Sequence, residues 1–196
     1  VMAGNDTQGL RYGTIETPEK YYLEWKEANP NHTPQSDISV PTHLTLANAN
    51  FTDQPLDFHL YHICNKHRFL DIINNFIVFD SGVKKTCRHN QYFGIQAAKK
   101  HIAQRRDGII WHTQGSGKSL TMVWLAKWIR ENVTNSRVLI ITDRTELDEQ
   151  IEKVFFGVDE SIYRTKSGAD LITQLNQPNP WLLCSLVHKF GRHGGD

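Results

Sequence analysis

One nine-residue segment constrains the fold of this chain more than any other: Trp111-His112-Thr113-Gln114-Gly115-Ser116-Gly117-Lys118-Ser119. It ends in Gly-Lys-Ser, and it lies between a short apolar run at 108–111 and an apolar pattern with helical character at 118–131. A Gly-Lys-Ser between a buried strand and a helix is the context of a phosphate-binding loop. The segment therefore predicts a strand, a tight turn and a helix, which is the repeating unit of a parallel α/β sheet.

The residue types of this loop suit a bound nucleotide. Gly115 and Gly117 let the backbone curl tightly and aim its N–H groups at phosphate oxygens, and the start of the following helix adds partial positive charge. Lys118 can reach the β- and γ-phosphates, and the Ser119 hydroxyl is placed to ligate Mg²⁺. His112 stands where the consensus has its first glycine. The alternative is a glycine-rich turn in which Lys-Ser occurs by chance. The predicted nucleotide-binding residues are Thr113, Gln114, Gly115, Ser116, Gly117, Lys118, Ser119 and Leu120.

A glutamine upstream of the loop adds a candidate for base recognition. Gln91 precedes Lys118 by 27 residues, after Arg88-His89-Asn90. A side-chain amide can pair with both the N6 donor and the N7 acceptor of adenine, so one glutamine can select ATP over GTP. The alternative is a surface glutamine on a helix. With this residue, the sequence predicts ATP and Mg²⁺ as cofactors.

Hydrophobic periodicity predicts the organisation of the rest of the chain. Apolar runs at 108–111, 137–142 and 181–187 alternate with helical patterns at 118–131, 147–155 and 169–176, which indicates a doubly wound parallel sheet. A helix is predicted over 86–104, and an amphipathic helix within 57–80. Its apolar stripe is Phe69, Leu70, Ile72, Ile73, Phe76 and Ile77. Residues 1–56 are predicted to be irregular, with short edge strands and one helix at 17–28. Their breakers are Pro30, Pro34, Pro41 and Pro55.

Charge is segregated along the chain although the net charge is only +1. Residues 1–57 hold three basic and eight acidic residues, and 58–106 hold nine basic and two acidic ones. The basic block suits either a polyanionic partner or a solvated helix face. No apolar stretch approaches a membrane helix and no secretory signal is visible, so no membrane partner is expected. Three widely spaced cysteines indicate a reducing, cytoplasmic setting.

Three segments together resemble the restriction (R) subunit of type I restriction-modification enzymes, which carries a superfamily 2 helicase motor. They are Arg88-x-x-Gln91-Tyr92-Phe93, the run from Gly108 to Met122, and Asp143-Arg144-Thr145-Glu146-Leu147-Asp148-Glu149-Gln150. The resemblance implies a connecting segment at 1–56 after a nuclease domain, and a helical lead-in with the adenine-contact motif at 57–106. It also implies the first RecA-like ATPase lobe, with a P-loop parallel sheet flanked by helices, at 107–196.

The same resemblance implies a function in bacterial or archaeal cytoplasm. R subunits pump double-stranded DNA with ATP and cleave it in complex with methylation and specificity subunits. The candidate DNA contacts are Arg144 and Thr145, which follow one predicted strand, and Ser185 and Lys189, which resemble a motif further along the family's sequence. The alternative for each of them is a polar residue at the surface. The alternative function is a nucleotide-binding regulatory or interaction module without motor activity.

No complete catalytic set is predicted in this chain. The family's DEAH-type motif should follow the strand at 181–187, and the chain, which starts at Val1 and not at Met, is expected to be a piece of a longer protein. Asp143 is followed by Arg144 and not by an acid, so it does not replace that motif. The letters Glu24-Trp25-Lys26 match a nuclease Glu-x-Lys and are interpreted as chance. We therefore expect the chain alone to be inactive as an enzyme although its family has ATPase and endonuclease activity.

Overall fold

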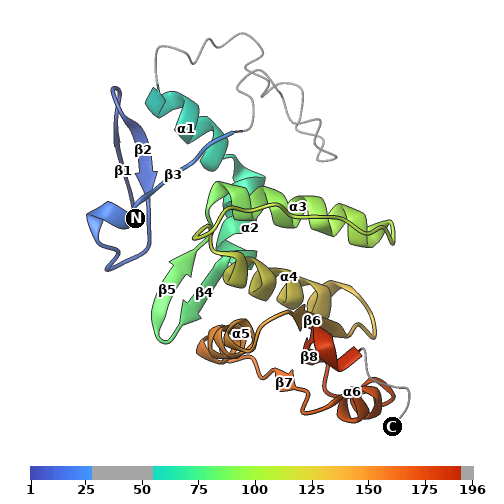
Figure 1. The fold of residues 1–196 in the computed structure, drawn as a ribbon. Helices are drawn as coiled ribbons and strands as arrows, with labels where there is room; N and C mark the ends of the chain where they lie inside the picture. The colour runs from blue at the N-terminus through green and yellow to red at the C-terminus, as the bar shows by residue number, and fades with distance from the viewer. Residues whose placement is uncertain (28–54, 191–196) are drawn as a thin grey trace. The chain divides into compact units, whose positions relative to one another are not determined.

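The computed structural model describes residues 1–27 and 55–190, and the chain forms two compact units (Figure 1). The first consists of Val1–Ile77 with Lys85–His89, and the second of Val78–Lys84 with Asn90–Asp196. The functional division at residues 56 and 106 stays a prediction, because compactness alone does not assign a function to a segment.

A small antiparallel sheet lies in the first unit. It has the order β1 (Met2–Asn5), β2 (Gly9–Tyr12), β3 (Leu23–Glu24). The helix predicted at 17–28 is wrong, because only one 3₁₀ turn, η1 (Glu19–Tyr21), forms before the chain enters β3. Leu23 pairs with Tyr12 across the sheet, and the Trp25 side chain is fully buried. Pairing and burial outweigh the local helical pattern here. Residue 28 lies outside the described residues.

Two helices and a strand replace the single amphipathic helix predicted within 57–80. They are α1 (Pro55–Ile63), α2 (Lys66–Asn75) and β4 (Ile77–Asp80). Asn65 starts α2 as its N-cap, accepting hydrogen bonds from the backbone of His67 and Arg68. In the predicted stripe Ile72 and Phe76 are buried, whereas Phe69, Leu70 and Ile73 are 36%, 53% and 48% exposed.

Pro55 is the first residue of α1 and not a breaker of structure. Proline is favoured there because the first helical N–H has no intrahelical partner. The other predicted breakers, Pro30, Pro34 and Pro41, lie outside the described residues.

A polar network surrounds the indole of Trp25 in the first unit. Glu27 accepts hydrogen bonds from Trp25 Nε1 at 2.8 Å and from Arg68 Nη1 at 2.5 Å, and it lies 3.3 Å from His62 Nδ1. Arg68 also stacks over the Trp25 ring, 5.2 Å from its centroid. Burial alone would raise the pKa of Glu27, but the hydrogen bonds from His62 and Trp25 and the charge of Arg68 lower it.

Acidification is expected to destabilise the first unit through Glu27. The folded-state pKa of this carboxyl is lowered, so its contribution to stability is present above the unfolded pKa and is lost as pH falls through the folded pKa. Urea unfolding, measured from about pH 6 to about pH 3, should show a smaller loss for Glu27→Gln than for the wild type. Equal losses in both chains would contradict this assignment.

The second unit contains a three-stranded parallel sheet. Its order is β6 (Val138–Thr142), β8 (Leu182–Leu186), β7 (Tyr163–Arg164), with β6 and β7 both parallel to β8. The predicted strands at 137–142 and 181–187 are confirmed, but β8 is central and β6 lies at an edge of this sheet. Every residue of β8 is buried, as expected for a central parallel strand.

Helices surround this sheet within the second unit. They are α4 (Lys118–Asn132), α5 (Thr145–Gly157) and α6 (Gly168–Leu175), with a 3₁₀ turn, η4 (Val187–Phe190), after β8. These match the helices predicted at 118–131, 147–155 and 169–176 to within a few residues. The helix α3 (His89–Ala103) matches the one predicted at 86–104. Before it, β5 (Val83–Thr86) pairs with β4 through a Ser81-Gly82 turn in which both residues have positive φ.

The strand predicted at 108–111 does not form. This segment runs back along α3 (Figure 1), where Ile110 and His112 approach Gly94. Ile109 and Trp111 face outward and are 90% and 88% exposed. A strand exists only when a neighbour pairs with its backbone, and within the described residues none pairs with this segment. The helices and parallel strands of the second unit confirm the α/β class, but the described residues do not form the full RecA-like sheet.

Candidate nucleotide-binding site

The Gly-rich loop adopts the backbone that its sequence predicts. Gly115 and Gly117 have φ of 77° and 85°, in the left-handed region where only glycine is unstrained. Gly117 is the N-cap of α4, and no side chain caps this helix end. The N–H groups of the first turn of α4 therefore remain available to an anion, and the 15-residue helix adds its dipole.

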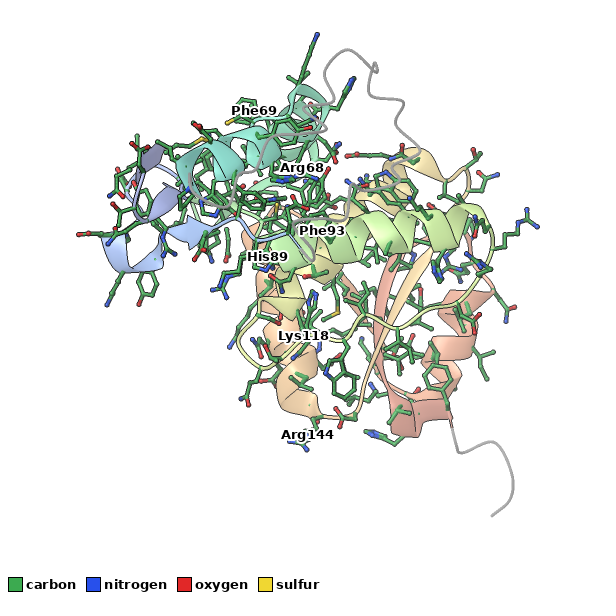
Figure 2. All side chains as sticks on the ribbon, turned by 90° about the horizontal axis from the view of Figure 1, so that it is seen from above. Arg68, Phe69, His89, Phe93, Lys118 and Arg144 are labelled. Carbon is green, nitrogen blue, oxygen red and sulfur yellow. The ribbon has the colours of Figure 1, made fainter. Side chains whose placement is uncertain are left out.

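Three donors of the loop converge on one carbonyl oxygen. The backbone N–H and the Oγ of Ser116 donate to Thr113 O at 3.4 and 2.7 Å, and Lys118 Nζ donates to the same oxygen at 3.0 Å. Lys118 also donates to His112 O at 3.1 Å. Its ammonium is thus held at the loop by neutral carbonyls and remains exposed (Figure 2). A phosphate is a stronger acceptor for this cation than a carbonyl, so the arrangement suits exchange of one for the other.

The other predicted nucleotide-binding residues lie around this loop. Thr113, Gln114 and Gly115 are exposed, whereas Ser119 and Leu120, in the first turn of α4, are half-buried. A Cβ added at Gly115 would meet no atom within 4 Å, so the loop is open on that side. The Ser119 hydroxyl follows Lys118 directly in the helix, and hydroxyl oxygen is a suitable ligand for Mg²⁺. The donor set therefore fits a magnesium ion that a triphosphate brings with it.

Gln91 lies against the loop and not at the surface. Its side chain is 3% exposed, and Nε2 donates to Gly117 O at 2.8 Å. The interpretation as a surface glutamine is therefore wrong. The role of Gln91 in adenine recognition stays a prediction.

The predicted DNA-contacting residues differ in accessibility. Arg144, the N-cap of α5, has a side chain 74% exposed and projects from the ribbon (Figure 2), and Thr145 is exposed beside it. Ser185 is 1% exposed and shares a hydrogen bond with Thr165 Oγ1 at 2.8 Å, so its hydroxyl does not reach the surface in this structure. Lys189 Nζ donates to the backbone carbonyl of Thr165.

A buried carboxylate that sequence reasoning gave no role, Asp148, lies one helical turn after Arg144 and Thr145. Asp148 accepts hydrogen bonds from Arg164 Nε at 2.6 Å and from Cys184 Sγ at 2.7 Å. It ties the first turn of α5 to β7 and β8. The sequence signal was the repeated acid in Leu147-Asp148-Glu149, but only the fold shows which acid points inward.

The basic block at 58–106 is split along the chain between the two units. Its Arg68 is engaged with Glu27. Lys99 lies over the ring of Trp128, 5.5 Å from the centroid. At least two of the nine basic side chains in this block are therefore engaged within their own unit.

Comparison with known proteins decides the family. The SWI2/SNF2 ATPase family matches residues 90–196, which is more than half of the chain. The chain belongs to the SWI2/SNF2 ATPase family. The matched range includes Gln91, the whole Gly-rich loop and all three strands of the parallel sheet.

Relatives of this SWI2/SNF2 chain include endonuclease subunits of type I restriction enzymes. The MjaIXP and MjaVIIIP subunits of Methanocaldococcus jannaschii are 31% and 32% identical over 72% and 79% of this chain. The HindI subunit of Haemophilus influenzae is 30% identical over 65% of it. The matches cover 15%, 16% and 12% of those proteins, so the chain spans less than a fifth of each. The resemblance inferred from the motifs is confirmed.

Two features of the described residues bear on other classes of function. None of the helices in the described part is long and apolar enough to cross a membrane. In residues 1–27 and 55–190, no group of three or more histidine, cysteine or acidic side chains could hold a metal ion.

Proposed function

We propose that this chain is the ATP-binding part of the DNA-translocating restriction subunit of a type I restriction endonuclease. The observation that carries the proposal is the loop at 113–119, with two left-handed glycines, an exposed lysine and an uncapped helix start. The SWI2/SNF2 match and the names of the relatives support it. In the complete complex the partners are double-stranded DNA and the methylation and specificity subunits.

Different groups of the loop bind different parts of ATP. Backbone N–H groups of Gly117, Lys118 and Ser119 hold the phosphates at the uncapped start of α4, and Lys118 neutralises charge on the β- and γ-phosphates. The Ser119 hydroxyl would be a ligand of the Mg²⁺ that is bound with ATP. That ion would offset negative charge on the phosphates. Binding requires Lys118 to exchange Thr113 O and His112 O for phosphate oxygens.

Hydrolysis needs a group that the described residues do not place at the loop. β8 is followed by Val187-His188-Lys189-Phe190, without an acid that could orient water. Asp143, after β6, is exposed and pairs with Arg144 at 3.6 Å. We therefore propose that the chain alone binds ATP without hydrolysing it efficiently.

Calorimetry on the wild-type chain tests the nucleotide site. Titration with ATP and Mg²⁺ should give saturable binding, and omission of Mg²⁺ should weaken it, because the metal offsets phosphate charge. The matched ligand is adenosine, which carries the base without phosphates and should bind far more weakly. Absence of saturable binding up to millimolar ATP would overturn the proposed function.

DNA binding by this chain is expected to depend on salt and on Arg144. An exposed arginine at a helix start suits a phosphate contact, which releases counterions and carries no base information. Arg144→Ala should weaken binding to unrelated duplexes equally and reduce the slope of log affinity against log salt by about 1.

Fluorescence anisotropy with two duplexes of different sequence, at several salt concentrations, measures this slope. Lys20→Ala, which removes one exposed charge from the first unit, serves as the matched control and should leave the slope unchanged. Salt-independent or undetectable binding would favour the regulatory module over the motor.

A further inference from the structure

Arg144 belongs to a two-residue connection between a strand and a helix. β6 ends at Thr142 and α5 begins at Thr145, so Asp143 and Arg144 join them. The Asp148 N–H closes the first turn of α5 by donating to Arg144 O at 3.2 Å. The exposed Arg144 side chain (Figure 2) therefore leaves the protein where the start of α5 directs it.

The two oxygens of the Asp148 carboxylate are bonded to two different strands. Oδ2 accepts from Arg164 Nε of β7 at 2.6 Å, and Oδ1 accepts from Cys184 Sγ of β8 at 2.7 Å. Arg164 and Cys184 are partners in the parallel register, so the two donors stand side by side on neighbouring strands. The carboxylate thus holds the start of α5 against two strands other than the one that leads into the helix.

The later turns of α5 are held by apolar packing. Ile151 and Phe155 are 4% and 1% exposed, and they follow Asp148 at helical spacing. Near the start of the helix, Thr145 and Leu147 are exposed. Apolar burial has no preferred direction, whereas two hydrogen bonds to donors on a sheet specify one position for the first turn.

The charge of Asp148 makes its effect on DNA binding a test of placement. A carboxylate repels phosphates, and DNA affinity rises with each cation that neutralises one. If charge alone mattered, a neutral residue in place of Asp148 would strengthen DNA binding. A loss of DNA affinity in such a variant would have to come from the position of Arg144.

We propose that Asp148 is a positioning residue for DNA binding. It fixes the start of α5 against β7 and β8, and it thereby holds Arg144 where a DNA phosphate can meet the guanidinium. Asp148 is 2% exposed and acts through Arg144 without contacting DNA itself. This inference rests on the proposed function, in which Arg144 is a DNA contact.

Asp148→Asn tests the proposal, because asparagine keeps the shape of the side chain but has one acceptor oxygen for two donors. Fluorescence anisotropy with a labelled duplex should show about fivefold weaker binding than in the wild type, and a salt slope reduced by up to about 1. Glu152→Gln is the matched control, since it removes one negative charge from the same helix and the same arginine. It should bind the duplex at least as tightly as the wild type. Equal or tighter binding by Asp148→Asn would overturn the proposal.

Cys184→Ala is a second variant, in which no charge changes. It removes one donor to the Asp148 carboxylate and leaves the bond from Arg164. Its DNA affinity should fall by a smaller factor, about twofold. This variant keeps the proposal testable if Asp148→Asn does not fold, and an unchanged affinity would overturn it.

A double-mutant cycle shows whether Asp148 acts through Arg144. In the Arg144→Ala background, Asp148→Asn should cause no further loss of DNA affinity, because the side chain that it positions is absent. A loss of the same size in both backgrounds would overturn the positioning role, since it indicates a general loss of structure.

Hydrogen exchange locates the change within the second unit. In Asp148→Asn without DNA, exchange should rise in peptides covering residues 143–150 and stay unchanged in peptides covering α4. A uniform rise would contradict a local role for Asp148.

The wild-type chain separates failure of the inference from failure of the proposed function. If the wild type did not bind the duplex at any salt concentration, the proposed DNA contact would fail and the inference with it. If the wild type bound and Arg144→Ala weakened binding while Asp148→Asn did not, the inference alone would fail.

Discussion

Replacing Lys118 with alanine is expected to weaken ATP–Mg²⁺ binding by about a hundredfold or more, roughly 3 kcal/mol. The side chain is exposed, and its ammonium donates hydrogen bonds to two backbone carbonyls of the loop. Its charge-assisted contacts therefore become strong only when phosphate replaces those carbonyls. Isothermal titration calorimetry of both chains measures the difference.

Stability should change little in the same variant. An exposed lysine bonded to solvated carbonyls contributes within about 0.5 kcal/mol to folding, so weaker binding cannot be ascribed to unfolding. Lys127→Ala, further along α4, is the matched control and should bind ATP like the wild type. Equal ATP affinity in Lys118→Ala and the wild type would remove the nucleotide site from this loop.

The phosphate loop could be predicted because its conformation is set locally. Gly115 and Gly117 tolerate positive φ where other residues do not, and α4 follows from its own apolar pattern. Both features depend on consecutive residues of one short segment, from Gly115 to the end of α4. The structure agrees with the prediction there.

The segment before the loop was mispredicted because its conformation is not set locally. The apolar residues at 108–111 have the composition of a buried strand, but strand formation depends on a pairing partner that composition does not reveal. The same limit applies to β6: an apolar run of this kind is typical of a central parallel strand, but β6 lies at the edge of this sheet. Its Ile141 is 51% exposed.

Side-chain environments at the site depended on tertiary contacts. Nothing in the sequence near Gln91 indicates that its amide meets Gly117, 26 residues later. The burial of Ser185 depends on the central position of β8, which is covered on both faces. The apolar run at 181–187 does not show which strand is central. The tertiary contacts of these side chains depend on how elements that are distant in the sequence pack together.

Asp148 is a polar position outside the loop where a substitution should cost considerable stability. Its side chain is 3% exposed and accepts from Arg164 and Cys184, while Arg164 is 30% exposed and also donates to Glu152 at 2.9 Å. Burial and this carboxylate together raise the pKa of Cys184 to about 12, which keeps the thiol protonated as a donor. Removing the carboxylate leaves a buried thiol and a partly buried guanidinium without their acceptor.

Asp148→Ala should therefore lower the free energy of unfolding by about 2–4 kcal/mol, below the full cost of breaking a buried ion pair because Arg164 retains some solvent. Glu152→Ala removes the other acid from the same arginine. Since the Glu152 side chain is 44% exposed, it should cost less than about 1 kcal/mol. Urea unfolding followed by circular dichroism compares the two variants directly. If Glu152→Ala cost as much as Asp148→Ala, the exposed pair and not the buried one would hold α5 to the sheet. In that case the exposed Arg164–Glu152 pair would also fix the position of Arg144 and Thr145 at the start of α5.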